Sequence, residues 1–201
     1  GKNLYTGWKE SYLHGEEKMQ QNKYDDDQFF KNYAAMPRSK DGLKAAGEWY
    51  ELEKILPNFQ GKKVLDLGCG YGWHCKYAAN HGALEVVGID LSHKMLEVAN
   101  KMNHDARIKY RQSAIEEIDF SIDSFDIVFS SLALHYISNF EELVKKISKS
   151  LKKNGELIFS VEHPLFTSSG EQDWSYDENG NIRHFPVDNY YYEGVREVNF
   201  L

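Results

Sequence analysis

Cysteine is scarce in this 201-residue chain, which contains only Cys69 and Cys75. One lies inside a glycine-rich stretch and the other follows a few residues later, so a disulfide framework is excluded and a metal site would need further ligands. We therefore predict no metal site and expect both cysteines to be small buried residues. Internal repeats and low-complexity linkers are also missing from the sequence.

Long apolar runs and clusters of positive charge are lacking as well. No segment approaches the roughly 18 apolar residues of a membrane span, and the first ten residues do not resemble a signal peptide. The net charge is −7 and the pI is about 5.6, which argues against binding nucleic acid through its phosphates. We expect a cytoplasmic protein that acts on a small molecule and binds neither nucleic acid nor membranes.

The sequence does contain a regular alternation of apolar strands and amphipathic helices, which begins at Val64. This alternation predicts an α/β fold, with a Rossmann-like, doubly wound and mostly parallel sheet covered on both faces. Expected strands cover 64–67, 85–90, 108–111, 125–130 and 156–161, and expected helices cover 73–81, a segment capped by Ser92, a short segment near Ala114, and 140–151. Their inward residues are expected to be Met95, Leu96, Ala99, Met102, Phe140, Leu143, Val144, Ile147 and Leu151.

The first strand runs directly into a turn with glycine at every second position, Gly68, Gly70 and Gly72. A strand, a glycine turn and a helix in this order are typical of a nucleotide-binding site, because the backbone can approach a ligand closely there. The dinucleotide pattern G-x-G-x-x-G would require a third glycine at position 73, which is Trp73. The pattern is instead D-x-G-x-G-x-G, with Asp66 two residues before the first glycine.

In this stretch, Val64 to Gly72, the chain resembles motif I of the class I S-adenosylmethionine (SAM)-dependent methyltransferases, of the type 11 group, at every position. The resemblance covers roughly residues 30 to 163. It implies SAM as the cofactor and the transfer of its methyl group, by in-line displacement, to an O, N or C nucleophile of a small molecule. The motif I residues implied to contact SAM are Asp66, Gly68, Cys69 and Gly70.

Three further sites are implied to complete the cofactor pocket. Asp90 ends the second strand, where a carboxylate can accept hydrogen bonds from both ribose hydroxyls, although NAD enzymes use the same carboxylate. The adenine is expected between Leu91 and the turn of Ser113, Ala114 and Ile115, and Ser113 stands where the family usually has aspartate. The fourth strand ends at Ser130 and Ser131, which are implied to lie beneath the methionine moiety.

A general base is needed only where the acceptor must lose a proton, and two histidines are candidates. His135 follows the fourth strand and is the first choice. His163 follows the fifth strand and is the second choice. Asp126 lies too early in its strand to act as a site residue. The ordinary alternative is that either histidine is a structural residue.

Residues 1–60 are expected to form a helical layer, with Phe29, Phe30 and Tyr33 on one face and a break at Met36-Pro37. A second apolar stripe joins Ala45, Trp49, Leu52 and Leu56. In the resembled family such a layer is a lid over SAM, and Arg38 would then reach the SAM carboxylate while Tyr33 covers the sulfonium. The alternative is that the layer only covers one edge of the sheet.

The whole chain is expected to form one methyltransferase domain, with the lid at 1–60, the SAM-binding core at 61–163 and an aromatic-rich segment of loops and a hairpin at 164–201. The family's sheet has seven strands, and the last one or two are expected to be missing here. We therefore expect a homodimer, or a partner segment, to cover the exposed edge. Two alternatives stay open, a non-catalytic SAM-binding regulatory protein and, less favoured, an NAD-dependent oxidoreductase.

Overall fold

The structure is a computed structural model, and it describes residues 23–168 and 173–192. The described residues divide between two compact units, with the boundary after Val161. Expectations that concern residues 1–22, 169–172 and 193–201, among them the start of the expected lid and the Ser169-Gly170 loop, lie outside the described residues.

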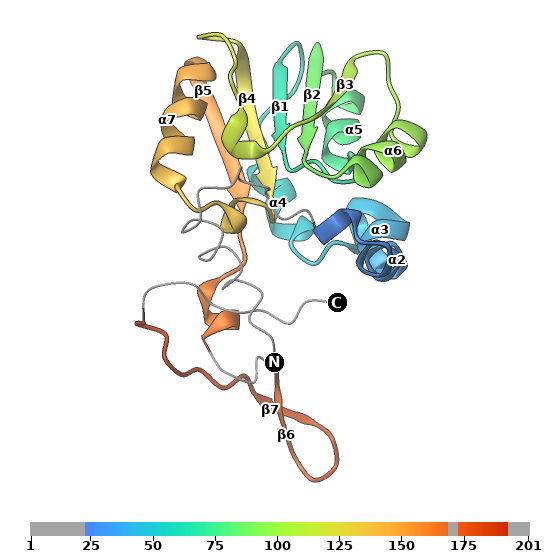
Figure 1. Cartoon of the computed structure of the whole chain (residues 1–201), viewed down its shortest axis with the longest axis vertical. Helices are drawn as coiled ribbons and strands as arrows, with labels where there is room; N and C mark the ends of the chain where they lie inside the picture. The colour runs from blue at the N-terminus through green and yellow to red at the C-terminus, as the bar shows by residue number, and fades with distance from the viewer. Residues whose placement is uncertain (1–22, 169–172, 193–201) are drawn as a thin grey trace, which may run out of the picture. The chain divides into compact units, whose positions relative to one another are not determined.

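The first unit is built on a five-stranded sheet in which every pair of neighbours is parallel (Figure 1). The strand order is β3-β2-β1-β4-β5, so the chain starts in the centre of the sheet and winds outward in both directions. This confirms the doubly wound α/β fold, and β5 forms one edge of the sheet. The strands are β1 (Lys63–Leu67), β2 (Glu85–Asp90), β3 (Ile108–Gln112), β4 (Phe125–Ser131) and β5 (Leu151–Ser160).

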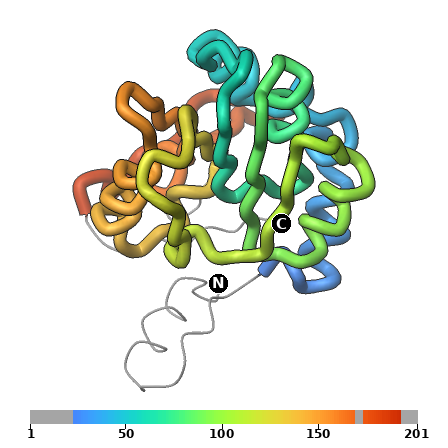
Figure 2. Tube along the Cα trace, turned by 90° about the horizontal axis from the view of Figure 1, so that it is seen from above, coloured from blue at the N-terminus to red at the C-terminus, as the bar shows by residue number. Residues whose placement is uncertain are grey.

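Alternate side chains of each central strand enter cores on opposite faces of the sheet, because successive residues of a strand point in opposite directions. Val64 and Ile127 pack with residues of α4 (Trp49–Ile55), α5 (Trp73–Asn80) and α6 (His93–Met102), whereas Leu65 and Val128 pack with α7 (Phe140–Ser150). Both faces are therefore covered (Figure 2), which explains why the central strands β1 and β4 are mostly buried and apolar.

Helices α6 and α7 begin at side-chain caps that the sequence supplies. The Ser92 hydroxyl accepts a hydrogen bond from the Met95 N–H at the start of α6, as predicted, and the Asn139 side chain does the same for Glu142 at the start of α7. Helix α5 starts differently, since Gly72 precedes it in the left-handed conformation with φ 75°. The expected short helix after Ala114 is the 3-10 turn η3 (Ile115–Glu117).

The N-terminal segment lies at the carboxyl end of the strands, below the sheet in Figure 1. It consists of η1 (Lys23–Asp25), α2 (Asp27–Ala35), α3 (Pro37–Asp41), η2 (Gly42–Ala45) and α4. The predicted break at Met36-Pro37 is confirmed, because α2 ends at Ala35 and Pro37 opens α3. In the second stripe, Trp49 and Leu52 are buried as expected, but the buried alanine is Ala46 rather than Ala45.

The expected helix over 140–151 ends one residue earlier, and Leu151 already pairs with Phe125 in β5. The ladder then shifts, so that Ile127 pairs with Glu156, and Asn154 in this bulge has φ 64°. The Asn154-Gly155 dipeptide therefore forms a bulge inside a strand instead of the predicted turn. Two residues expected to point inward, Met102 and Phe140, are exposed because each lies at the end of its helix.

The second unit contains the 3-10 turn η5 (Pro164–Thr167) and two short strands, β6 (Ser175–Tyr176) and β7 (Ile182–His184). The strands are antiparallel, and the connection closes where the Asp177 carboxylate accepts hydrogen bonds from the N–H groups of Asn179 and Asn181. The predicted hairpin around Asp177 to Gly180 is confirmed.

Candidate functional site

The glycine turn leaves the end of β1 and is fixed to β2 by its own backbone. The N–H groups of Gly68 and Cys69 both donate to the carbonyl of Ile89, at 2.8 and 2.9 Å. Gly68 has φ 75°, and a Cβ placed there would lie 2.4 Å from the Cβ of Ala133. Gly70 has φ 52°, but a Cβ there would meet nothing within 4 Å. The turn is thus tightly packed at Gly68 and open at Gly70.

A short relay of hydrogen bonds supports the turn from behind. The buried Asn103 side chain donates to the Tyr71 carbonyl at 2.8 Å, and the Tyr110 hydroxyl donates to the Asn103 carbonyl at 3.1 Å. Tyr110 also lies against Gly72, where a Cβ would come within 2.1 Å of its hydroxyl oxygen. The third glycine of the motif is therefore required by Tyr110.

Asp90 lies at the carboxyl end of β2 and connects the glycine turn to the start of α6. One carboxylate oxygen accepts a hydrogen bond from Gly70 N–H at 2.8 Å, and the other accepts one from Ser92 N–H at 2.9 Å. Burial raises the pKa of this carboxyl to about 6, although both hydrogen bonds act in the opposite direction. Asp90, the residue predicted to bind the ribose, thus lies beside Gly70, where the turn is open.

Asp66 is buried inside the core of the first unit. Its Oδ2 accepts a hydrogen bond from the Cys75 thiol at 3.2 Å, and it lines a cavity of about 10 Å³ together with His74. Within the described part of the chain, Asp66 Oδ1 and His74 Nε2 have no hydrogen-bond partner. Burial raises the pKa of Asp66 to about 7 and lowers that of His74 to about 3.

Both cysteines are free and buried, as expected, and burial raises the pKa of the Cys69 thiol to about 11. They flank Gly88, where a Cβ would lie 2.8 Å from Cys75 Sγ and 3.0 Å from Cys69 Sγ. The cysteines therefore pack the glycine turn and α5 against β2. Among the described residues, no group of three or more His, Cys, Asp or Glu is placed to hold a metal ion.

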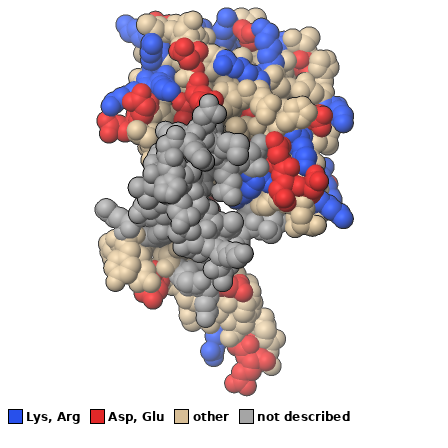
Figure 3. All heavy atoms as spheres, viewed as in Figure 1, with Lys and Arg blue, Asp and Glu red and all other residues tan. Residues whose placement is uncertain are grey.

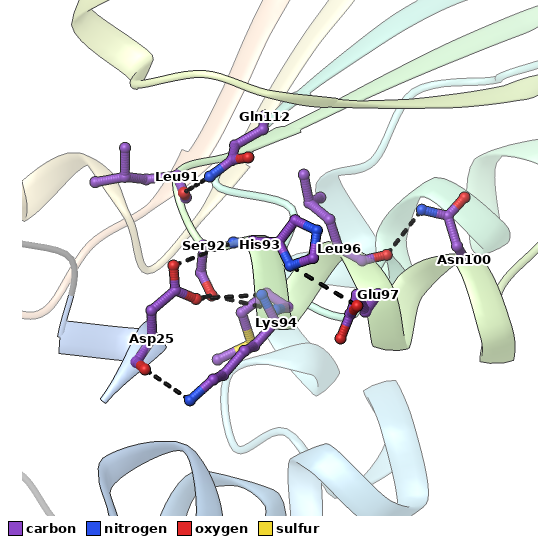
Figure 4. Close-up of polar contacts among 10 residues, drawn as sticks. Asp25, Leu91, Ser92, His93, Lys94, Leu96, Glu97, Asn100 and Gln112 are labelled. Atoms are coloured by element: carbon purple, nitrogen blue, oxygen red, sulfur yellow. Dashed lines mark hydrogen bonds and ion pairs between the residues drawn. The ribbon is translucent and has the colours of Figure 1, made fainter. Parts of the chain in front are cut away.

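The residues predicted around the adenine come together between the ends of β2 and β3. Ser113 N–H donates to the Asp90 carbonyl at 3.1 Å, and Gln112 donates to the Leu91 carbonyl at 3.0 Å (Figure 4). Ala114 is buried, whereas Leu91 is partly exposed. The Cδ1 atom of Ile115 lies 3.5 Å from the Cβ position of Gly68.

At the end of β4 the two predicted serines have different surroundings. Ser130 is buried and donates to the Leu67 carbonyl at 2.8 Å, so it ties β4 to the end of β1. Ser131 contacts Ser160 Oγ at 3.1 Å and donates to Glu48 at 3.2 Å. Glu48 also accepts a hydrogen bond from Arg38 at 2.6 Å. Arg38 is thus held by a carboxylate of its own chain, which the sequence analysis did not anticipate.

An aromatic group connects the N-terminal segment to the glycine turn. Tyr33 contacts Tyr71 edge to face, with ring centroids 5.7 Å apart, and Phe30 contacts the same ring at 6.2 Å. Tyr24 in turn contacts Tyr33 at 5.5 Å. The predicted residue Tyr33 therefore lies over the turn that follows β1, where a lid residue is expected.

A carboxylate of the N-terminal segment also reaches the first turn of α6 (Figure 4). Asp25 accepts hydrogen bonds from Ser92 Oγ at 2.5 Å and from Lys94 N–H at 3.2 Å. The Lys94 ammonium closes the contact by donating to the Asp25 carbonyl at 2.7 Å and to the carboxylate of Asp27. A negative group at a helix N-terminus is stabilised by the unpaired N–H groups there. We call this set of contacts the Asp25 latch.

The two candidate bases belong to different units. His135 lies in η4 (Leu134–Tyr136), and its ring centroid is 4.3 Å from that of Tyr136. Burial, and then the positive charge of Lys23, lower the pKa of His135 to about 4, so its imidazole is neutral near pH 7. His163 belongs to the second unit, where its Nδ1 accepts a hydrogen bond from Leu165 N–H at 3.2 Å and its ring stacks on Tyr190.

Asp126 is confirmed as a structural residue, because its carboxylate accepts hydrogen bonds from Lys63 N–H and the Lys152 ammonium, both at 2.8 Å. On the face drawn in Figure 3, acidic and basic side chains alternate over the first unit. No helix in the described part of the chain is both long and apolar enough to cross a membrane.

Known proteins resemble this chain in sequence and in structure. Residues 65–159 match the family described as "Methyltransferase domain". A solved structure from Listeria monocytogenes, assigned to the SAM-dependent methyltransferases, is 55% identical, with a TM-score of 0.72 over 79% of this chain and 72% of that one. A SAM-dependent methyltransferase from Mesorhizobium loti is 39% identical, with a TM-score of 0.67 over 74% and 68%.

The fold and the glycine site thus define a class I methyltransferase. The chain belongs to the SAM-dependent methyltransferases, and SAM is their cofactor. A protein of Haemophilus influenzae is 37% identical over 89% of this chain and 73% of its own length. The chain spans only 28% of the Caenorhabditis elegans phosphoethanolamine N-methyltransferase 2, which is 34% identical. These relatives give no support to the oxidoreductase or the non-catalytic alternative.

Sequence reasoning missed Glu48, Asp25 and Lys23, which all meet the site from the N-terminal segment. Each is an ordinary charged residue of a short helix or turn, and each reaches a partner more than 60 positions away. The only available signal was the three successive aspartates that begin at Asp25, just before an amphipathic helix.

Proposed function

We propose that this methyltransferase acts on a small-molecule nucleophile, with His135 as the group that accepts a proton where the acceptor must lose one. The observation that carries the assignment is the position of His135 in η4, directly after the carboxyl end of β4. In open α/β sheets ligands bind at the carboxyl ends of the strands. With a pKa of about 4 the imidazole carries no proton near pH 7, so its nitrogen can accept one, although it is a weaker base than an ordinary histidine.

The residues present fit SAM as the group bound at the glycine turn. Gly70 faces open space, Asp90 lies beside it, and Ser113 to Ile115 with Leu91 border the neighbouring strand ends. In the proposal Asp90 holds the ribose, the turn from Gly68 to Gly70 lies along the cofactor, and Tyr33 covers it. Asp66 and Ser130 support the turn from inside the core. When bound, SAM supplies a methyl group already activated by its sulfonium.

Because the methyl group is activated, this chain mainly has to align the acceptor and exclude water. The Asp25 latch and the Tyr33–Tyr71 contact would hold the N-terminal segment closed over the site, as a lid. Arg38 would bind the carboxylate of the methionine moiety only after exchanging its Glu48 partner. His163 stays the second candidate for the base.

The experiment pairs calorimetry with a screen of methyl acceptors. We expect SAM and S-adenosylhomocysteine to bind and NADH not to bind. With an accepted substrate, His135→Ala should lower turnover at least ten-fold at unchanged affinity for S-adenosylhomocysteine, and His104→Ala, at an exposed position, is the matched control. If neither His135→Ala nor His163→Ala lowers turnover by more than a few fold, the assignment of the base is wrong.

The proposal extends to the organisation of the protein. The chain is taken as one cytoplasmic methyltransferase domain, and a second copy is expected to pair along the edge strand β5, where Phe159 is exposed. Light scattering tests this pairing, and a monomer at micromolar concentration would contradict it.

A further inference from the structure

One lysine of the N-terminal segment is surrounded by aromatic rings. The Lys23 ammonium lies 5.0 Å from the centroid of Tyr136, 5.2 Å from that of Phe29 and 5.8 Å from that of Tyr24. All three distances fall within the roughly 6 Å at which an aromatic face attracts a cation. We call the three rings the Lys23 cage.

The cage is assembled from two distant parts of the chain. Tyr24 and Phe29 come from η1 and α2 and meet edge to face at 5.0 Å, whereas Tyr136 comes from η4 after β4. The Tyr24 and Tyr136 hydroxyls share a hydrogen bond at 3.4 Å. The other lysine contacts differ, since Lys54, for example, lies over the single exposed ring of Tyr50. Three rings around one ammonium form a site that is suited to a cation.

The charged groups around the cage also favour a positively charged ligand. The run of aspartates that begins at Asp25 directly follows Tyr24. Burial is the main cause that raises the pKa of the Tyr24 hydroxyl, and the negative charge of Asp90 adds to it. His135, next to Tyr136, is neutral near pH 7, so it adds no positive charge. A positively charged group is therefore attracted to the cage both by the rings and by the acidic segment beside it.

The cage borders the proposed cofactor site on two sides. On one side Tyr24 contacts Tyr33, which covers Tyr71 of the glycine turn. On the other side the Tyr136 N–H donates to the Ala133 carbonyl at 3.1 Å, and Ala133 is the residue that packs against Gly68. A ligand in the cage would therefore be a neighbour of a ligand on the glycine turn.

We propose that the Lys23 cage receives the nitrogen of the methyl acceptor, which is an amine, and that Lys23 occupies the cage until this cationic group displaces it. The proposal rests on the proposed function and names its substrate class. Aromatic cages recognise methylated ammonium groups in other proteins, because the ring faces attract a large, weakly hydrated cation.

Amine methylation also fits the cage on grounds of charge balance. The amine enters the cage as an ammonium ion and first loses one proton to water. A nitrogen–carbon bond then forms with the lone pair of the neutral amine as the carbon–sulfur bond breaks, and the electron pair of that bond stays on sulfur. The positive charge thus moves from sulfur to nitrogen, and no proton has to be removed during the transfer. A cage that faces the nitrogen stabilises the positive charge that develops on this atom in the transition state. An interaction that is stronger in the transition state than in the ground state accelerates methyl transfer.

The test compares choline, as a cationic probe, with 3,3-dimethylbutan-1-ol, its neutral counterpart of the same shape. Binding is measured by calorimetry on the full chain saturated with S-adenosylhomocysteine. We expect choline to bind at least ten-fold more tightly than the alcohol, because only the cation interacts with the ring faces. Lys23→Met should tighten choline binding by about 3- to 10-fold, since it removes the competing ammonium.

Two kinds of variant complete the design. Tyr136→Leu and Phe29→Leu should each weaken choline binding several-fold while the affinity for S-adenosylhomocysteine stays within about two-fold. Lys54→Met is the matched control, because it removes a lysine that contacts one exposed ring outside the cage. It should leave choline binding unchanged. Thermal unfolding of each variant shows whether it is folded.

The outcomes separate this proposal from the proposed function. If S-adenosylhomocysteine binds but choline binds no better than the alcohol, in both the wild type and Lys23→Met, the cage is only a structural contact and the proposal is overturned. Weaker choline binding in folded Lys23→Met would also overturn it. If S-adenosylhomocysteine itself does not bind, the proposed function fails, and choline binding without it still tests the cage.

Discussion

The glycine turn and the N-terminal segment meet at the same site but are built in different ways. The turn is part of the folded core: positive φ angles, hydrogen bonds to Ile89 and the relay through Asn103 and Tyr110 fix its path. The N-terminal segment is held by distant contacts, such as Asp25 to α6 and Glu48 to Ser131. Changes in the turn should therefore affect the stability of the whole fold. Changes in the N-terminal segment should affect only how firmly this segment covers the glycine turn.

The largest expected effect comes from Gly68→Ala. The new Cβ would lie 2.4 Å from that of Ala133 at a residue with φ 75°, so both a clash and backbone strain follow. We expect the free energy of unfolding to fall by about 4 kcal/mol in urea denaturation. Gly70→Ala is the matched control, because it has positive φ but no clash, and it should cost only about 1 to 2 kcal/mol. Equal costs would contradict this view of the turn.

The second prediction concerns pH and the buried carboxyl of Asp66. Its pKa of about 7 in the folded protein exceeds the ordinary value of an aspartate carboxyl, about 3.9, so the folded state binds the proton more tightly than the unfolded state. The stability of the wild type relative to Asp66→Asn should therefore decrease by about 3 kcal/mol as pH rises from 4 to 7. Urea denaturation of both proteins at several pH values measures this difference.

Asp126→Asn is the control for the pH experiment. The hydrogen bonds from Lys152 and Lys63 outweigh burial and lower the pKa of Asp126. The stability of the wild type relative to this variant should therefore rise with pH between the folded pKa and the ordinary pKa of an aspartate, and stay constant above it. A rise of the same sign for Asp66 would show that its carboxyl is not buried as described.

A smaller effect is expected at Asp90, where the turn meets α6. Asp90→Asn replaces a carboxylate that accepts hydrogen bonds from Gly70 and Ser92 with an amide that has one acceptor oxygen. We expect about a ten-fold loss of affinity for S-adenosylhomocysteine in calorimetry, because hydrogen bonds to a charged group are worth more than neutral ones. Glu97→Gln, on an exposed face of α6, should change this affinity less than two-fold.

The smallest effect is expected in the N-terminal segment itself. Asp25→Ala removes the carboxylate of the Asp25 latch but leaves Ser92 to cap α6, so global stability should fall by only about 1 kcal/mol. Hydrogen exchange should instead become faster in α2 while the strands stay protected. Unchanged exchange in α2 would show that the aromatic contacts alone hold the segment in place.

The sequence predicted the sheet well because its signals are local. The alternation of apolar segments with amphipathic helices located all five strands. Ser92, as the predicted cap, located the start of α6. The start of β5 was missed, because Asn154-Gly155 is equally suited to a turn and to a bulge, and only pairing with β4 decides between them. Arg38 illustrates the limit for the site, since no pattern in the sequence indicates that Glu48 accepts its guanidinium.

The relay from Tyr110 through Asn103 to Tyr71 has a consequence for ligand affinity. The relay joins the glycine turn to the end of α6 and to β3, so the turn is ordered when the domain folds and not when a ligand arrives. Much of the conformational entropy of the turn is then lost on folding, and little of it is subtracted from the binding free energy. Asn103 would thus set how tightly a ligand is held without touching it.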